Sequence, residues 1–207
     1  MIIQPAVNTQ GLGRASTPAN TDSQHAPASD VTEPVVLPRG GVTDLPDAAE
    51  WSLSVRWPDL GPAGVEVDVV AFLTDDEEVA GDEDFVFFNA PTHPSGAADL
   101  TLDVPGEALV NIRPTHVPNR TVQVLIAAAV DDGVAFGRVG PVEMVLRDQD
   151  GTTAARATLD AATAEQTLIL ATLYRRGEAW RFRAVGQGYE FGLAALAVRH
   201  GVDIDED

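Results

Sequence analysis

From Val35 onward the chain is divided into short apolar runs that are separated by turn residues. Gly, Pro, Asp or Asn bounds most of these runs, as is typical of β-strands in an all-β domain. The runs cover residues 51–57, 65–73, 84–88, 121–130, 142–148, 167–175 and 180–185. Seven strands at this spacing indicate packed antiparallel sheets. We therefore predict a mainly β fold, a two-sheet antiparallel β-sandwich, with a hairpin loop at Gly177 between the last two runs.

One segment near the C-terminus has a helical pattern instead. It follows a glycine-rich turn, and Gly201 is placed to stop a helix. Its apolar residues are Phe191, Leu193, Ala194, Leu196, Ala197 and Val198. We expect one short amphipathic helix over about residues 191–200, docked on the sandwich by its apolar face.

The two ends of the chain differ in composition from this domain. Residues 1–33 are rich in Ser, Thr, Pro, Asn, Gln and Ala, which predicts a disordered N-terminal extension. Such an extension is either a tether to a partner or a tolerated addition, and we favour the second. The sandwich domain is expected to cover residues 35–203, and residues 204–207 form an acidic tail.

The charge distribution limits the possible partners. The formal net charge is −19, and the segment between Arg56 and Arg113 contains 13 acidic residues and no arginine or lysine. Binding to a phosphate backbone needs basic side chains, so nucleic acid and anionic membrane surfaces are disfavoured. The N-terminus lacks the features of a signal peptide and no apolar run is long enough to span a bilayer, so we expect a soluble cytoplasmic protein. The absence of cysteine excludes disulfides, thiolate metal sites and thiol chemistry.

Motifs of common enzymes are missing, and we expect a protein that is not an enzyme. The sequence has no GxSxG, Walker or HExxH motif, and no two of its histidines have metal-ligand spacing. The stretch GQGYEFG at 186–192 matches a dinucleotide fingerprint poorly and is better explained as a turn before the helix. A hydrolase with paired carboxylates as acid and base is a disfavoured alternative.

The acidic segment has the composition of a calcium site. Calcium prefers six to eight oxygen ligands, several of them anionic. Glu66 and Asp68 alternate on a predicted strand and therefore share one face. Asp82 and Asp84 lead into the next strand, and Asn89 ends it. The alternative is an ordinary solvated acidic face, because acidic runs between strands are usually exposed.

Three segments together resemble the TerD family of bacterial tellurium-resistance and stress-response proteins. They are VDVVAFL at 67–73, GDEDFVFFN at 81–89, and LYRRGEAWRFRAVGQGYEFGLAALAVRHGV at 173–202. The resemblance covers about residues 35–203. It implies a β-sandwich that binds calcium through loops at one end, with a role in the response to tellurite and other stresses.

The resemblance also implies a set of calcium ligands. The family's aspartates before the AFL element map onto Glu66 and Asp68, and those of its D-x-D-F element map onto Asp82 and Asp84. Asn89 matches the asparagine that ends that element. The next loop of the family is longer and more acidic, and here Asp99 and Glu107 stand for its aspartate and its closing glutamate.

The shortened loop leaves two functions open. The first is a calcium-binding module with one weakened site built from Asp68, Asp82 and Asp84, helped by Glu66, Asp99 or Glu107. The second is a metal-independent structural or assembly protein that kept the fold and lost most of the site. The expected partners are other proteins of a stress-response complex or further copies of the chain.

Four arginines of the C-terminal hairpin allow a further alternative. They are Arg175, Arg176, Arg181 and Arg183. We interpret them as charges on the outward face of the hairpin, while the aromatic residues between them belong to the core. They could instead form a basic face for an acidic partner or for the acidic loop of another copy.

Overall fold

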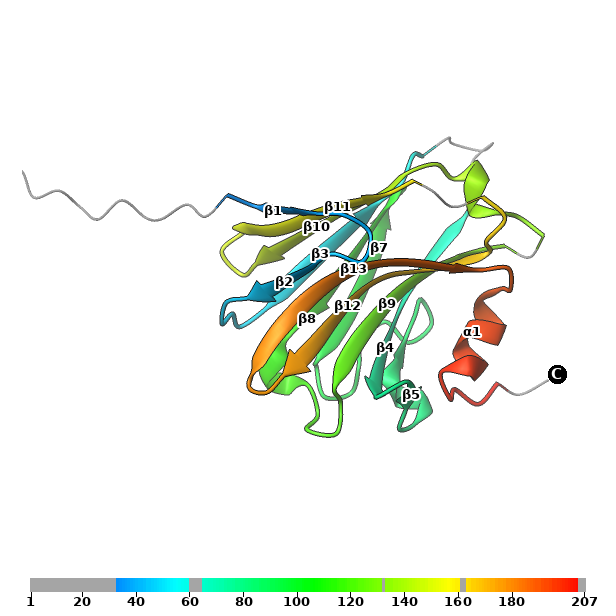
Figure 1. The fold of residues 1–207 in the computed structure, drawn as a ribbon. Helices are drawn as coiled ribbons and strands as arrows, with labels where there is room; N and C mark the ends of the chain where they lie inside the picture. The colour runs from blue at the N-terminus through cyan, green and yellow to red at the C-terminus, as the bar shows by residue number, and fades with distance from the viewer. Residues whose placement is uncertain (1–32, 60–64, 132, 161–162, 205–207) are drawn as a thin grey trace, which may run out of the picture. The chain divides into compact units, whose positions relative to one another are not determined.

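The computed structural model describes residues 33–59, 65–131, 133–160 and 163–204. The predicted extension over residues 1–33 lies outside this part of the chain except for its last residue, as does the tail after residue 204. Within the described residues the fold is a two-sheet β-sandwich with one α-helix, which confirms the predicted fold class (Figure 1).

The first sheet is formed by six strands in the described part of the chain. Their spatial order is β1 (Val35–Leu37), β11 (Thr153–Leu159), β10 (Val142–Asp148), β3 (Trp51–Arg56), β8 (Glu107–Ile112) and β7 (Ala98–Val104). Every pair in it is antiparallel except β1 and β11, which are parallel. The prediction of purely antiparallel pairing is wrong at this edge, because the chain crosses to the other sheet after β1 instead of returning in a hairpin.

The second sheet, like the first, combines hairpins of consecutive strands with pairings between strands that are far apart in the sequence. It contains β2 (Val42–Leu45), β13 (Ala179–Tyr189), β12 (Thr167–Arg176), β9 (Gln123–Val130), β4 (Val67–Asp75) and β5 (Glu78–Val79), and β6 (Phe85–Val86) also pairs with β4. All of its strand pairings in the described residues are antiparallel. The predicted hairpin is confirmed between β12 and β13, where Arg176 pairs with Ala179 and Gly177 has φ +65°. A positive φ at the first loop residue favours glycine and matches the twist of the two strands.

The second sheet is buried on both faces, which explains its long apolar runs. In β4, Val69 and Leu73 face the core between the sheets, whereas Val70 and Phe72 face the opposite side. There they join a second apolar cluster, which we call the helix cluster. Its buried members are Val70, Phe72, Phe85, Leu125, Ala127, Ile169, Leu196, Ala197 and Val202.

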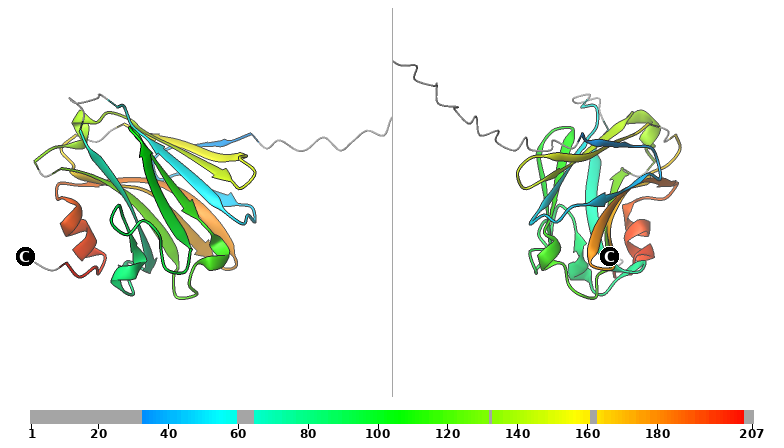
Figure 2. Two further views of the ribbon diagram at one scale, coloured as in Figure 1. Left: turned by 180° about the vertical axis from the view of Figure 1, so that it is seen from behind. Right: turned by 60° about the vertical axis from the view of Figure 1, so that its left-hand side comes forward.

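Helix α1 (Leu193–Arg199) covers this outer face, as predicted. Leu196 and Ala197 are buried against the sheet, and the second view of Figure 2 shows the helix on the side away from the first sheet. His200 at the helix end holds the chain after β4: its Nδ1 donates to the carbonyl oxygen of Glu77 at 2.6 Å, and its own carbonyl accepts from the Val79 amide at 2.8 Å. No helix in the described residues is long and apolar enough to cross a membrane.

The segment expected to be a shortened loop is instead a β-hairpin. Strands β7 and β8 pair from Ala98 with Ile112 to Val104 with Glu107, and Pro105 and Gly106 form the turn. Gly106 has φ +73°, the conformation that a proline–glycine turn requires at its second position. The run predicted at 84–88 also differs, because Asp82–Asp84 form a 3-10 turn (η2) before the two-residue strand β6.

Candidate functional site

The structure separates the seven predicted metal ligands into three places. Glu66 and Asp68 lie at the start of β4, whereas Asp82, Asp84 and Asn89 follow its end. Because Phe85 pairs with Phe72, Asp84 lies beside Leu73. Asp68 and Leu73 are five residue steps apart along β4, which is roughly 17 Å at about 3.3 Å per residue. Ligands of one calcium ion lie about 2.4 Å from it, so the carboxylates of Asp68 and Asp84 cannot share an ion in this arrangement.

The third place is the outer face of the first sheet. The Asp99 carboxylate forms an ion pair with Arg113 and accepts a hydrogen bond from Asn111 Nδ2 at 2.8 Å. Glu107 accepts from Arg56 Nε at 3.0 Å and from the Ser54 hydroxyl at 2.8 Å. Those two hydrogen bonds lower the pKa of Glu107. Both carboxylates therefore belong to cross-strand polar pairs and do not reach the residues near β4.

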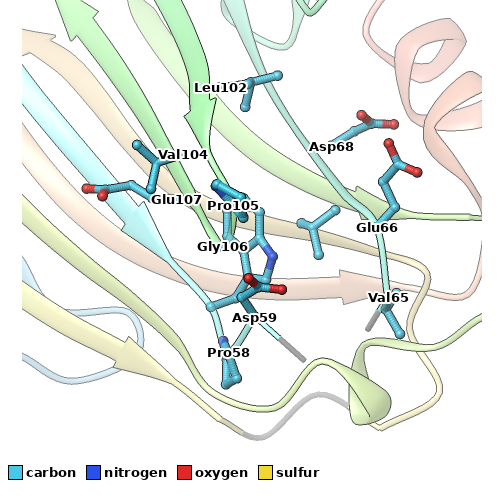
Figure 3. A pocket seen from close by; sticks show the side chains of 12 residues that line it. Pro58, Asp59, Val65, Glu66, Asp68, Leu102, Val104, Pro105, Gly106 and Glu107 are labelled. Atoms are coloured by element: carbon cyan, nitrogen blue, oxygen red, sulfur yellow. The ribbon is translucent and has the colours of Figure 1, made fainter. Parts of the chain in front are cut away.

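Glu66 and Asp68 share one face, as the alternation predicted. Figure 3 shows their carboxylates side by side, with Glu107 on the opposite side of the neighbouring groove. Partial burial raises the pKa of Asp68, and the nearby carboxylates of Glu66 and Asp131 raise it further. The structure gives none of these three an ion pair with a basic side chain within the described residues. This edge of β4 is thus a place where negative charge is brought together without a counter-charge.

Removing the charge of Asp68 is expected to stabilise the domain. A carboxyl group whose pKa is raised by folding binds protons more readily in the folded state. Its contribution to stability is therefore lost as pH rises from its unfolded pKa through its folded pKa. The Asp68→Asn variant should gain about 0.5–1 kcal/mol in free energy of unfolding at pH 7, and the gain should vanish below about pH 4. Urea denaturation at the two pH values measures this. The exposed Asp75→Asn variant is the control, and an equal gain there would contradict the local explanation.

Asp84 is a fully buried carboxylate at the centre of a polar network. Its Oδ1 accepts from His93 Nε2 at 2.9 Å, both of its oxygens lie 3.0 Å from Arg120 Nη2, and Oδ2 accepts from the Ala80 amide at 3.0 Å. Burial alone would raise the pKa of Asp84, but the hydrogen bonds from His93, Arg120 and Ala80 lower it overall. The guanidinium of Arg120 thus occupies the position that a cation would take at this carboxylate.

Ser95 extends this network to an Asp–His–Ser arrangement. The Ser95 hydroxyl lies 2.8 Å from His93 Nδ1 and 2.9 Å from the His116 carbonyl oxygen, to which it can donate. The amides of Ser95 and Ala97 donate to His93 Nδ1 and to the Ser95 hydroxyl, and the Gly96 amide donates to the His93 carbonyl. These three amides are engaged within the loop, so none is free to stabilise an oxyanion. The arrangement ties the loop together.

The other two residues of this group are exposed. The Asp82 carboxylate accepts a hydrogen bond from the Asp203 amide at 3.0 Å, which connects η2 to the segment after α1. Asn89 lies in the turn between Phe87 and Ala90. Neither contacts the buried network around Asp84 through an interaction that the structure shows.

A calcium ion fits only part of the predicted set. Asp84, Asp99 and Glu107 each have an arginine partner, and a metal would have to displace it. In the described part of the chain, no group of three His, Cys, Asp or Glu residues is arranged to hold a metal ion. Glu66 and Asp68 are the predicted ligands that remain available as a pair.

The arginines of the C-terminal hairpin divide into two kinds. Arg181 forms an ion pair with Asp44 on β2. Arg175 donates to the Val117 carbonyl oxygen at 3.0 Å and lies over the Trp180 ring, 5.1 Å from its centroid. Arg176 and Arg183 are exposed. Within the part of the chain that the structure describes, Arg176 and Arg183 are therefore the two hairpin arginines whose side chains have no ion-pair or hydrogen-bond partner, and they alone remain for the basic face of the alternative interpretation.

The comparison with protein families shows to which family the chain belongs. A model described as the TerD domain matches residues 35–200. The chain belongs to the TerD family. It is similar to the tellurium resistance protein TerD of Serratia marcescens, with 31% identity over 82% of this chain and 98% of that protein. It is also 26% identical to general stress protein 16U of Bacillus subtilis, over 67% of this chain and 79% of that protein.

A solved TerD-like structure has the same fold. The homologue of telluride resistance protein (TerD), SCO6318 of Streptomyces coelicolor, superposes with a TM-score of 0.57. The match covers 73% of this chain and 96% of that one at 14% identity. Sequence reasoning thus found the TerD segments and the Glu66–Asp68 pair, but it did not find His93 and Arg120 as partners of Asp84. No local sequence pattern connects these two residues to Asp84, because they lie 9 and 36 positions from it along the chain.

Proposed function

We propose that this chain is a non-enzymatic binding module of a bacterial tellurite and general stress response. Family membership and the names of the relatives, which include a tellurium resistance protein and a general stress protein, support this role. The proposed setting is the cytoplasm, with other stress-response proteins or further copies of the chain as partners.

Calcium is the proposed ligand, at the edge formed by Glu66 and Asp68. The observation that supports it is the position of Glu66 and Asp68 on one face of β4, where neither forms an ion pair with a basic side chain of the described residues. Burial and the charges of Glu66 and Asp131 accordingly raise the pKa of Asp68. A bound divalent cation would relieve this repulsion and receive two or three anionic oxygens, with backbone or water oxygens completing its coordination. With so few carboxylates, the affinity is expected at the weak end of the range for calcium sites.

Calorimetric titration of the chelator-treated protein tests this proposal. We expect a dissociation constant of about 0.1–1 mM and a rise in melting temperature, because a ligand that binds only the folded state stabilises it. The Glu66→Gln, Asp68→Asn variant should lose both effects. The matched control is Asp75→Asn, Glu77→Gln, which removes the same charge from exposed positions and should behave as the unmodified protein. No heat and no thermal shift at millimolar calcium would reject calcium binding.

A metal-independent assembly module is the second candidate. The Asp84 network favours it, since Arg120 and His93 already neutralise and hydrogen-bond the carboxylate that a metal would need. In that case the chelator-treated and the calcium-supplemented protein should have the same melting temperature and the same assembly state. The titration above separates the two candidates directly.

A further inference from the structure

A groove of about 230 Å³ opens between the two sheets at the end of the sandwich where β12 turns into β13. Trp51 lines it from the start of β3 in the first sheet, and Trp180 lines it from β13 in the second. Its walls and rim come from the chain after β2, the chain after β8 and the β12–β13 turn. We call the groove the tryptophan groove, and its members used below are Trp51, Trp180, Pro46, Pro114, Asp47 and Glu178.

The two indole rings of this groove are held in place by the rest of the domain. Trp51 is only 1% exposed and belongs to the core between the sheets. The guanidinium of Arg175 packs over the Trp180 ring, 5.1 Å from its centroid, and Arg175 Nη2 donates to the Val117 carbonyl oxygen at 3.0 Å. Fixed aromatic rings bind a partner with little loss of conformational entropy. Together with two prolines, they form a rigid apolar surface.

The groove also offers a hydrogen-bond donor without a partner. Within the described residues Trp51 Nε1 forms no hydrogen bond, yet it is not one of their fully buried unpartnered atoms, which belong to Thr121, Thr167 and Arg175. Its access to solvent is through the groove that Trp51 lines. An indole N–H on a buried ring usually finds an acceptor. A carbonyl oxygen of a ligand in the groove would supply one.

Two carboxylates stand at the rim of the groove. Asp47 and Glu178 are exposed, and neither forms an ion pair with a basic side chain in the part of the chain that the structure describes. The described residues that line the groove include no basic one. The rim therefore favours a ligand that carries positive charge.

A proline-rich segment with basic residues matches the apolar surface, the donor and the charge together. In a polyproline II helix the rings are apolar, the carbonyl groups have no internal hydrogen bonds, and little entropy is lost on binding. We propose that the tryptophan groove binds such a segment of a partner protein. Its proline rings pack on Trp51 and Trp180, and one of its carbonyl oxygens accepts from Trp51 Nε1. Its basic side chains reach Asp47 and Glu178. This inference rests on the proposed role as a binding module and gives that module a partner of defined chemistry.

Calorimetry with the full chain and the peptide acetyl-Pro-Pro-Arg-Pro-Pro-Arg-Pro-Pro-amide tests it. We expect saturable binding, and at least fivefold weaker binding when glutamate replaces arginine or when alanine replaces proline. The amide of N-acetylarginine alone should bind at least tenfold more weakly than the peptide. Absence of peptide binding, equal binding of the three peptides, or equal binding of the single arginine overturns the proposal.

Variants locate the binding surface. Trp51→Phe keeps a buried ring but loses the indole donor, and it should weaken peptide binding about threefold to fivefold. The control is Trp57→Phe, because Trp57 follows the other end of β3 and lines a different groove. An equal loss of affinity in the two variants would overturn the assignment.

A second pair of variants tests the charge of the rim without touching the core. Asp47→Asn with Glu178→Gln should weaken peptide binding about fivefold and reduce its dependence on salt. Asp75→Asn with Glu77→Gln removes the same charge from exposed positions outside the groove and should leave binding within about twofold. Since all four positions are exposed, loss of folding does not explain a difference. Equal binding by both double variants would contradict the proposed role of the rim.

Two further measurements separate this proposal from its neighbours. Self-association of the free chain in sedimentation that Trp51→Phe abolishes would make a second copy the occupant and overturn a proline-rich partner. Calcium titration of Trp51→Phe should match that of the unmodified protein. Loss of peptide binding with intact calcium binding, or the reverse, then assigns a failure to one proposal alone.

Discussion

Replacing Asp84 by alanine is expected to lower the free energy of unfolding by about 3 kcal/mol, because it leaves buried donors without their acceptor. The Ala80 amide and His93 Nε2 lose their partner, and Arg120 loses both of its contacts with the carboxylate. Arg120 is 46% exposed and can turn toward water, whereas His93 is 3% exposed and cannot. The unpaired groups near His93 therefore account for most of the loss.

Urea denaturation with Asp82→Ala as the control measures this effect. Asp82 is exposed and accepts one hydrogen bond, from the Asp203 amide, so its removal should cost less than about 1 kcal/mol. The transition midpoint should fall strongly for Asp84→Ala with little change in the denaturant slope. Equal midpoints for the two variants would show that the network around Asp84 contributes nothing to stability.

The difference in stability between the unmodified protein and Asp84→Ala depends on pH in a defined way. The folded pKa of Asp84 is lowered, so its stabilising contribution is complete above the unfolded value near 3.9 and is lost as pH falls through the folded pKa. The difference in stability between the unmodified protein and Asp84→Ala should therefore shrink below about pH 4. A difference that stays constant at lower pH would mean that ionisation of Asp84 plays no part.

The fold was predictable wherever an apolar run was long enough to identify. Strand β4 is buried on both faces, so VDVVAFL stands out without strict alternation. Strand β11 has the opposite character, because its buried positions include Ala155 and Ala157, which have weak strand preference. Strands β1, β2 and β5 are two to four residues long and give little periodic signal.

The hairpin of β7 and β8 was predictable from its turn chemistry. Pro105–Gly106 is a strong turn signal, and Ala108, Val110 and Ile112 alternate with polar or less buried residues. A loop in this stretch would make Asp99 and Glu107 candidate loop ligands, whereas the strands direct both to cross-strand partners. The pair Glu66 and Asp68 was predictable from alternation alone, since that property needs no knowledge of tertiary contacts.

Replacing Phe72 by alanine is the other change with a large expected effect, because Phe72 joins the sandwich to helix α1. Its side chain is fully buried, stacks on Phe85 with ring centroids 4.6 Å apart, and lies 5.0 Å from the His200 ring. Truncation of a buried phenylalanine typically costs about 3–5 kcal/mol through lost apolar burial and the cavity that remains. The cavity here would open within the helix cluster and not between the sheets.

Leu73→Ala provides the matched comparison, since Leu73 is equally buried but faces the core between the sheets. Both variants should lower the melting temperature. Only Phe72→Ala should also accelerate hydrogen exchange of the Leu196 amide in α1 and of the His200 amide at its end, at temperatures where the sheets remain folded. The reason is that α1 is seven residues long, too short to be stable without its apolar contacts. Equal exchange of α1 in the two variants would show that the helix unfolds only with the whole domain, and that the two apolar clusters form a single cooperative unit.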